Sequence, residues 1–445
     1  MAEHREEQTV RAGAAVRDIT PAQEVLMSGY AARTAPSAGV HDPLTVRALV
    51  VQRTALVTVD AVGLHEDTCA QVRVACRPWA EHVLVHATHT HGGPVSMPGR
   101  LGAGLVESWL QAVVEACRDA VAEASSTQQE VTVLTGYGPD PGVASNRRRP
   151  DGPKDPALPV LRLVRADGST LATLVSYACH PVVLGPDNHQ ITADYPGGVR
   201  RLLEQHGGGT VLFATGCAGD QNTGHTVGGG TPYDPADRTF ARCAQVADLI
   251  AAAAQKAELR SGTGDVAAAS TAVELDLDPL TAAELRQEEE HWAAKAAKAA
   301  ASTGRTALYD AWRTWAAETR TDALADGAEQ QTRWQGRVNA VRWGPAVLLT
   351  LPGEPFCQAG LELRAHIQGA AAVFVLGYTD GCPGYLPSAA EYPFGGYEVC
   401  DAHRYYGMPG PFAPGSLERL VEEALRLSAV VGAADDQLTG PPRGQ

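Results

Sequence analysis

Polar residues that follow apolar strands are the first candidates for chemistry in this sequence. The run ATHTHGGP contains His89 and His91, two positions apart at the end of a predicted strand. Side chains at positions i and i+2 of a strand project from the same face, so both imidazoles can approach one metal ion or one bound water molecule. Taken alone, the pair is equally compatible with two histidines on a surface loop.

Two further residues occupy comparable places. His180 ends the apolar run ATLVSYACH, and Glu354 follows the apolar strand and Pro-Gly turn of LLTLPGE. A single histidine at the end of a strand is more often structural. Imidazoles from separate strands together with one carboxylate, however, form the ligand set of many hydrolytic zinc sites, which keep a position open for water. The sequence therefore predicts a mononuclear zinc site built from histidines of the first half and Glu354 of the second.

The elements that must position these residues alternate between strands and helices. Strands are predicted at 46–52, 55–63, 82–88, 131–137, 158–164, 172–180 and 210–216, and helices at 104–124, 197–206 and 236–259. The two strands at 46–63 surround a short turn, which is typical of a hairpin or a buried strand pair. The alternation predicts the α/β class, with a mixed or mostly parallel β-sheet core covered by helices.

The later part of the chain interrupts and then resumes this pattern. Residues 281–331 are rich in Ala, Glu, Lys and Arg and predict an inserted helical hairpin, which either packs on the core as a solvated pair or forms a lid. Strands at 338–343, 346–351 and 371–378, a helix between the last two, and a final helix at 414–431 follow. The polar tail 433–445 is expected to be loose. We expect a single domain spanning residues 1–445.

Composition limits the classes of partner. The chain has 445 residues and a formal net charge of -15, which argues against a nucleic-acid partner and against adsorption to anionic lipid. Residues 1–10 are charged and contain no apolar run, so we expect neither a secretory signal nor a membrane anchor there. The nine cysteines occur singly, without a C-x-x-C pair. This favours a soluble cytoplasmic protein with buried thiols over a disulfide framework.

Motifs along nearly the whole chain, from about residue 10 to 427, resemble the neutral/alkaline ceramidases and occur in the same order. They are VRDITPA, GVHDPLTVRALVV, HATHTHGGP, SNRRRP, ACHPVVLG, ITADYPGG, GCAGDQN, LPGEPF and GYLPSAAEYPFGGYE. The resemblance implies the fold of the ceramidase catalytic domain and the hydrolysis of an amide bond. It also implies a zinc ion with a defined ligand set, namely His89, His180, Glu354 and Tyr385.

The same resemblance assigns three further roles. It implies that His91 contacts the zinc-bound water, that Arg147 of SNRRRP reaches the substrate or its oxyanion, and that Tyr397 donates a hydrogen bond to the scissile carbonyl. Arg147 is preferred to the two arginines after it because it follows asparagine, as in the family. Tyr385 lies twelve positions before Tyr397, a spacing that the family shares.

These roles form a coherent hydrolytic mechanism. Zinc lowers the pKa of a bound water toward neutrality, and His91 can accept the water proton and pass it to the leaving amine. Arg147 and Tyr397 would stabilise the oxyanion, at about 3 to 4 kcal/mol for each preorganised donor. Nearby polar residues are candidates to orient the histidines through their second ring nitrogen. They are Asp60, Asn188, Asp194 and Asp220.

The substrate expected from the sequence is a small soluble amide rather than a membrane lipid. The family has a serine-containing stretch near the substrate where this chain has Thr215, Gly216 and Cys217, and aromatic residues make up only 6% of the chain. We therefore expect no stable membrane association, while a homo-oligomer stays open. Alternatives are an esterase, a lactonase or an intramolecular cyclase with the same zinc site, a non-catalytic binding protein, and a cysteine hydrolase using Cys179 or Cys217.

Overall fold

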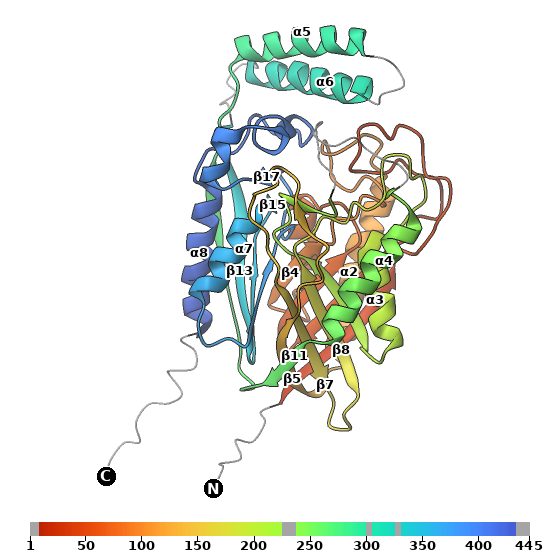
Figure 1. Ribbon diagram of the computed structural model, residues 1–445, viewed down its shortest axis with the longest axis vertical. Helices are drawn as coiled ribbons and strands as arrows, with labels where there is room; N and C mark the ends of the chain where they lie inside the picture. Colours follow the sequence, from red (N-terminus) through yellow and green to blue (C-terminus); the bar gives the residue numbers. More distant parts are fainter. Residues whose placement is uncertain (1–8, 225–236, 300–304, 325–330, 433–445) are drawn as a thin grey trace, which may run out of the picture.

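The computed structural model describes residues 9–224, 237–299, 305–324 and 331–432 (Figure 1). The predicted tail at 433–445 and the turn of the predicted helical hairpin lie outside the described residues. Two β-sheets pack face to face, and helices cover the outer face of each. The expected α/β class with a mixed sheet covered by helices is confirmed, although the strands divide into two sheets and most pairs are antiparallel.

The larger sheet has nine strands, in the order β4-β3-β2-β1-β5-β7-β8-β9, with β11 pairing beside β5. Its pairs are antiparallel except near the two ends, where β3 runs parallel to β4 and β8 runs parallel to β9. The strands are β1 (Val10–Asp18), β2 (Thr45–Val51), β3 (Thr54–Val59), β4 (His82–Ala87), β5 (Gln129–Gly138), β7 (Leu158–Val164), β8 (Thr170–Tyr177), β9 (Thr210–Thr215) and β11 (Glu258–Ser261).

The second sheet has four strands in the order β12-β13-β14-β16, of which only β14 and β16 run parallel. They are β12 (Val266–Asp276), β13 (Arg333–Trp343), β14 (Ala346–Thr350) and β16 (Ala372–Leu376). Two short pairs lie at the loops, β6 (Ser145–Asn146) with β10 (Gln221–Asn222), and β15 (Glu354–Pro355) with β17 (Tyr385–Leu386).

An apolar layer joins the two sheets. Leu49 of the first sheet and Trp343 and Phe374 of the second belong to one cluster of fully buried side chains. The Trp343 indole Nε1 also donates a hydrogen bond to Thr54 Oγ1 at 2.7 Å, which satisfies the only polar atom of that side chain. Strands β2 and β3 are buried along their whole length because sheet and helices cover both faces.

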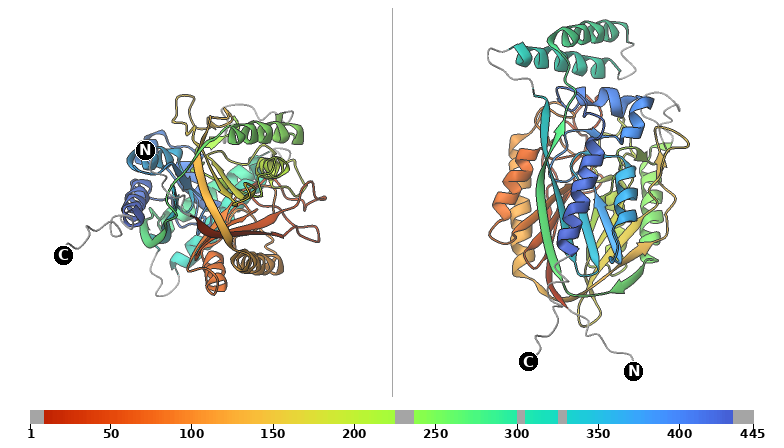
Figure 2. Two further views of the ribbon diagram at one scale, coloured as in Figure 1. Left: turned by 90° about the horizontal axis from the view of Figure 1, so that it is seen from below. Right: turned by 90° about the vertical axis from the view of Figure 1, so that its left-hand side faces the viewer.

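Helices form the outer layers. Helices α1 (Glu66–Cys76), α2 (Glu107–Ser126), α3 (Asp194–Gln205) and α4 (Phe240–Gln255) cover the larger sheet. Helices α7 (Cys357–His366) and α8 (Ser416–Gly432) cover the second sheet from the opposite side (Figures 1 and 2). Every buried residue that α8 contributes to this packing is on one face of the helix, as its amphipathic pattern predicts.

Three parts of the sequence prediction are corrected. The helix expected at 236–259 ends at Gln255, because residues 258–261 pair with the edge of β5 as β11. The pattern does not reveal α1, a helix of 11 residues in which polar and apolar types are mixed. It also does not reveal β12, an Ala-rich strand that is largely half-exposed. The hairpin expected at 46–63 is present as the antiparallel pair β2 and β3.

Helices α5 (Ala282–Lys298) and α6 (Arg305–Leu324) pack against each other at one end of the molecule, beyond the loops that follow the strands (Figure 1). One side chain of the core anchors them. The Arg404 guanidinium pairs with Glu288 at 2.7 Å and lies 5.5, 5.6 and 5.7 Å from the ring centroids of Trp292, Trp312 and Trp315. A desolvated cation facing several indole rings gains from each ring.

The role of Arg404 in holding the pair of helices α5 and α6 on the core can be tested. Arg404→Leu should speed hydrogen exchange in α5 and α6 by about tenfold or more, because it removes the ion pair and the cation–π contacts, while β2 and β3 keep their protection. Hydrogen exchange followed by mass spectrometry measures both regions. Arg313→Leu is the matched control, since Arg313 is half-exposed and its ion pair in the described part of the chain is with Asp310 on its own helix. Equal exchange in wild type and Arg404→Leu would show that the hairpin docks without this anchor.

Candidate metal centre and active site

Four of the residues singled out in the sequence meet at one point between the two sheets. The Nε2 atom of His89 lies 3.3 Å from His91 Nε2 and 3.3 Å from Glu354 Oε2. The Nε2 atom of His180 lies 2.8 Å from the same oxygen of Glu354. His89, His180 and Glu354 are completely buried, whereas His91 is half-buried. The structure thus gathers donor atoms from segments that are far apart in the sequence.

Loops, rather than strand alternation, bring the histidines together. Strand β4 ends at Ala87, and His89 adopts a left-handed backbone conformation with φ of 65°. The prediction that His89 and His91 share the face of a strand is therefore wrong, and the turn between them directs both rings to one point. His180 likewise follows the end of β8, where its N–H donates to the Gln221 carbonyl at 2.9 Å. Backbone hydrogen bonds of this kind hold the loop in its conformation, and the types of side chain in the sequence do not predict them.

The Glu354 carboxylate reaches the site from a loop of the second sheet. It follows β14 after a Pro-Gly turn and pairs with Tyr385 in the short parallel ladder of β15 and β17. The pairing places Tyr385 beside the carboxylate, and the Tyr385 ring stacks with that of His180 at a centroid distance of 6.4 Å. The register of the β15–β17 pair therefore explains why Tyr385 lies next to the site.

Two backbone carbonyls determine which ring nitrogens face the site. His180 Nδ1 lies 2.5 Å from the Ala218 carbonyl oxygen, and His89 Nδ1 makes a short contact with the Val62 carbonyl oxygen. A carbonyl oxygen can only accept, so each Nδ1 carries a hydrogen and donates it. Burial lowers the pKa of His180 to about 4, so its ring is neutral near pH 7. The His180 Nε2 atom then presents a lone pair, and within the described residues it has no hydrogen-bond partner.

Glu354 presents the complementary charge. Burial alone raises the pKa of its carboxyl, but the neighbouring His89 and His180 outweigh this effect and hold the pKa below its ordinary range. The Tyr406 hydroxyl donates a hydrogen bond to Oε1, and the Tyr378 hydroxyl lies 3.5 Å from Oε2. Oε2 is therefore the oxygen that faces the imidazole nitrogens.

This donor set fits a divalent cation. A lone pair on His180 Nε2 and a carboxylate oxygen 2.8 Å away repel each other unless a cation or a proton lies between them. The possible ligand atoms of His89, His91 and His180 lie within 4.8 Å of one another, and so do those of His89, Glu354 and Cys382. Imidazole and carboxylate are the donors of hydrolytic zinc sites. Burial raises the Cys382 pKa well above its ordinary value, which leaves that thiol protonated and a poor ligand.

The side chains expected to orient the histidines do not do so. Asp60 instead binds Arg200 through both oxygens, each at 2.7 Å. Asp194 and Asp220 accept hydrogen bonds mainly from backbone N–H groups of neighbouring loops. Asn188 closes an exposed turn. The prediction is wrong because peptide carbonyls are the partners of Nδ1 in His89 and His180, and the sequence does not indicate which peptide carbonyl will face a ring.

Arg147 and Tyr397 lie around Tyr385. The Arg147 guanidinium carbon is 5.3 Å from the centroid of the Tyr385 ring, and the rings of Tyr385 and Tyr397 are 6.0 Å apart. Arg147 Nε lies 3.0 Å from a carboxylate oxygen of Glu398, while its buried Nη2 has no hydrogen-bond partner. Burial alone would lower the Arg147 pKa, but Tyr385 and Glu398 outweigh it and raise the pKa.

The two following arginines have other partners. Arg148 pairs with Glu398 at 2.7 Å, and Arg149 pairs with Glu391 at 2.6 Å. Both ion pairs hold the segment of η3 (Ala389–Phe394) and η4 (Tyr397–Asp401), which carries Tyr397. Among the three arginines, Arg147 is thus the one that contacts the Tyr385 ring.

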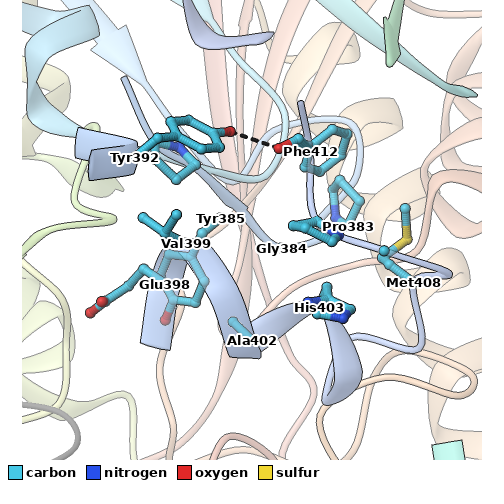
Figure 3. A pocket seen from close by; sticks show the side chains of 13 residues that line it. Pro383, Gly384, Tyr385, Tyr392, Glu398, Val399, Ala402, His403, Met408 and Phe412 are labelled. Carbon is cyan, nitrogen blue, oxygen red and sulfur yellow. Dashed lines mark hydrogen bonds between the residues drawn. The ribbon is translucent and has the colours of Figure 1, made fainter. Parts of the chain in front are cut away.

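The cavity behind Tyr385 is too small for a substrate. It has a volume of about 10 Å³, and its walls include Tyr385, Val399 and His403 (Figure 3). The Tyr392 hydroxyl closes one side by donating to the Phe412 carbonyl at 2.7 Å. Such a volume holds roughly one water molecule. A groove of about 340 Å³ at the start of α1 and α2 contains none of the predicted site residues.

The structure also bears on residues that the sequence left ambiguous or missed. Cys179 and Cys217 are fully buried and burial raises the pKa of both thiols, so neither has the properties of a nucleophile.

Tyr406 and Tyr378 touch Glu354 but were not among the predicted site residues. Both tyrosines lie in loops, and no spacing or neighbouring residue distinguishes them from other loop aromatics.

Comparison with known proteins agrees with the resemblance. A family model described as "Neutral/alkaline non-lysosomal ceramidase, N-terminal" matches residues 10–267. Neutral ceramidase B of Dictyostelium discoideum is 26% identical over 265 residues, which cover 50% of this chain and 37% of that protein. A neutral ceramidase of Mycobacterium tuberculosis is 25% identical over 488 aligned residues, which cover 87% of this chain and 74% of that protein. The matched part thus spans well under half of the first relative.

Solved structures show the same fold. The neutral ceramidase of Pseudomonas aeruginosa matches with a TM-score of 0.72 and 20% identity, over 99% of this chain and 76% of that one. A second structure, described as a ceramidase complexed with C2, matches with a TM-score of 0.73 and 19% identity, over 97% of this chain and 76% of that one. The family model covers more than half of the chain, including His89, His91 and His180. The chain therefore belongs to the neutral/alkaline non-lysosomal ceramidase family.

Proposed function

We propose that the protein is a zinc-dependent hydrolase that cleaves the amide bond of a small soluble substrate. The observation that carries the proposal is the convergence of His89, His180 and Glu354, in which an imidazole lone pair and a buried carboxylate oxygen lie 2.8 Å apart. The names of the relatives add support, because each describes a ceramidase, an enzyme that acts on an amide.

Each residue has a defined task in the proposed reaction. His89, His180 and Glu354 would hold the ion, with Tyr385 as the fourth ligand. When bound, zinc supplies Lewis acidity and an activated water. Burial and the other histidines lower the pKa of His91 well below its ordinary value, so its ring is neutral near pH 7 and can accept a proton.

Proton transfer and charge stabilisation complete the reaction. His91 would take a proton from the attacking water and return it to the leaving amine, giving a carboxylate and a free amine. Arg147 and Tyr397 would stabilise the negative charge that develops on the carbonyl oxygen. The unpartnered Nη2 of Arg147 supports this role, since a buried guanidinium N–H without an acceptor can receive one from the substrate.

Two further features concern the surroundings of the protein. In the described part of the chain, no helix is both long and apolar enough to cross a membrane. The described cysteines are free thiols, eight of them buried, which supports our proposal of a reducing, cytoplasmic environment.

An ester or lactone could meet the same groups, and an intramolecular amine could replace water, so esterase, lactonase and cyclase activities are tested beside amide hydrolysis.

Metal analysis tests the ion site. Wild-type protein should bind one zinc per chain, and His89→Ala should weaken zinc binding by more than about a hundredfold, because even the hydrogen-bond partners of metal ligands contribute roughly 10- to 100-fold. Chelator competition and elemental analysis measure both. His366→Ala is the control, since His366 is exposed at the end of α7 and, within the described residues, hydrogen-bonds to Glu362 of its own helix. Equal zinc content in wild type and His89→Ala would refute the assigned site.

Tyr406 provides a second test. Tyr406→Phe removes the hydrogen bond to Glu354 Oε1 and should lower zinc affinity by about 10- to 100-fold, with little change in fold. The control is Tyr392→Phe, which removes a half-buried tyrosine hydroxyl that donates to the Phe412 carbonyl. If Tyr406→Phe lowered the melting temperature and left zinc affinity unchanged, its hydroxyl would serve the fold alone.

A substrate panel tests the reaction. N-acyl amines, esters and lactones that share one acyl group should be compared with zinc-loaded wild type, using His89→Ala as the blank. Amide hydrolysis above the blank is the expected result, measured as release of the free amine. Cleavage restricted to esters or lactones would replace the proposed activity by the corresponding alternative. No turnover of any member, together with substoichiometric zinc, would indicate a binding protein.

A further inference from the structure

Arg33 is the exception among the buried arginines in the described part of the chain. The others each pair with a carboxylate, Arg47 with Glu204, Arg100 with Glu66, Arg147 with Glu398 and Arg200 with Asp60. Arg33 is only 5% exposed, yet within residues 9–224, 237–299, 305–324 and 331–432 no carboxylate oxygen lies within ion-pair distance of it. Its guanidinium is thus buried without an ion pair in these residues, although the charge of Asp187, beyond ion-pair distance, acts to raise its pKa.

The hydrogen bonds of Arg33 do not compensate for its burial. Its Nη1 donates to the His91 carbonyl oxygen at 2.7 Å, and its buried Nε has no partner. Burial lowers the Arg33 pKa, although an arginine side chain stays protonated in proteins. An unpaired buried charge is costly, and proteins normally retain one only where a partner completes it. An anionic ligand is a partner of that kind.

The surroundings place this charge beside the proposed active site. The Arg33 guanidinium lies 4.9 Å from the centroid of the Tyr30 ring, and the Tyr30 ring lies 4.8 Å from that of His91. A second guanidinium, that of Arg238, lies 5.8 Å from the same Tyr30 ring and donates to the Tyr30 hydroxyl at 3.1 Å. Two guanidinium groups therefore lie around the Tyr30 ring, next to His91.

Two neighbours of Arg33 at this place, Tyr30 and His91, are half-buried rather than fully buried. Arg147, the other arginine near the proposed reaction centre, has the Glu398 carboxylate as its ion-pair partner. Within the described residues Arg33 has no such partner, so Arg33 is the arginine that can form an ion pair with a ligand.

Resting on the proposed function, we infer that Arg33 is a specificity-determining residue and that the natural substrate is an amide bearing a carboxylate close to the scissile bond. A guanidinium recognises a carboxylate through charge-assisted, often paired, hydrogen bonds. The contact of Arg33 with the His91 main chain limits the separation, so the carboxylate lies within a few bonds of the amide. N-acyl amino acids and monoamides of dicarboxylic acids belong to this class.

Matched substrates test the inference. Zinc-loaded wild type should be assayed with N-acetylglycine and its neutral analogue N-acetylglycinamide, and with succinamic acid and succinamide, which carry the charge on the acyl side. In one of the two pairs, kcat/KM should favour the anionic member by about 10- to 100-fold. Arg33→Met should abolish this preference by slowing the anionic member alone, and Arg33→Lys should restore part of it.

Controls separate specificity from a structural role. Arg47→Met removes a buried arginine that pairs with Glu204 and should leave the preference unchanged, whatever it does to stability. If Arg33→Met slowed the anionic and neutral members equally, Arg33 would act only by holding the His91 loop, and the inference would be overturned. Equal turnover of both members by wild type would overturn it as well.

A binding measurement keeps the inference distinct from the proposed function. Zinc-free protein should bind N-acetylglycine more tightly than N-acetylglycinamide in calorimetric titrations, and Arg33→Met should lose that difference. This result would support the anion site even if no amide were hydrolysed, an outcome that would refute only the proposed function. Absence of any difference in wild type would refute the anion site even if amides were cleaved.

Discussion

The site depends on two hydrogen bonds from histidine rings to main-chain carbonyls. The Val62 and Ala218 oxygens can only accept, so they require a hydrogen on Nδ1 of His89 and His180 and direct each Nε2 toward Glu354. A carboxylate oxygen that faces the unprotonated Nε2 of His180 is repelled unless a cation lies between them. The proposed metal binding and the proposed hydrolysis both depend on this constraint.

The convergence of three candidate side chains was predictable from the sequence, because each of them follows an apolar strand. The apolar runs before His89, His180 and Glu354 form β4, β8 and β14, and the three side chains meet. The α/β class and most elements were likewise predictable from periodicity. The division into two sheets was not, because a strand buried on both faces reads as the same apolar run whether its neighbour is a helix or a second sheet.

Other features of the site could not be predicted from the sequence. Asp60 resembles a partner for a histidine, since it too follows a strand, but its carboxylate binds Arg200, which lies 140 positions away. Tyr406 lies in a loop whose course depends on distant contacts. The left-handed backbone of His89 is unusual for a residue with a side chain, and the surrounding loop rather than local preference imposes it. Tertiary contacts decided each of these cases.

The division of donors between the sheets has an evolutionary consequence. His89 and His180 belong to the first sheet and Glu354 to the second, and the interface that fixes their separation includes Trp343 and its hydrogen bond to Thr54. Recombination between relatives at the junction of β11 and β12 would unite histidines from one parent with a carboxylate from another. Such a hybrid keeps every ligand, yet it inherits a working centre only if complementary inter-sheet side chains travel with them.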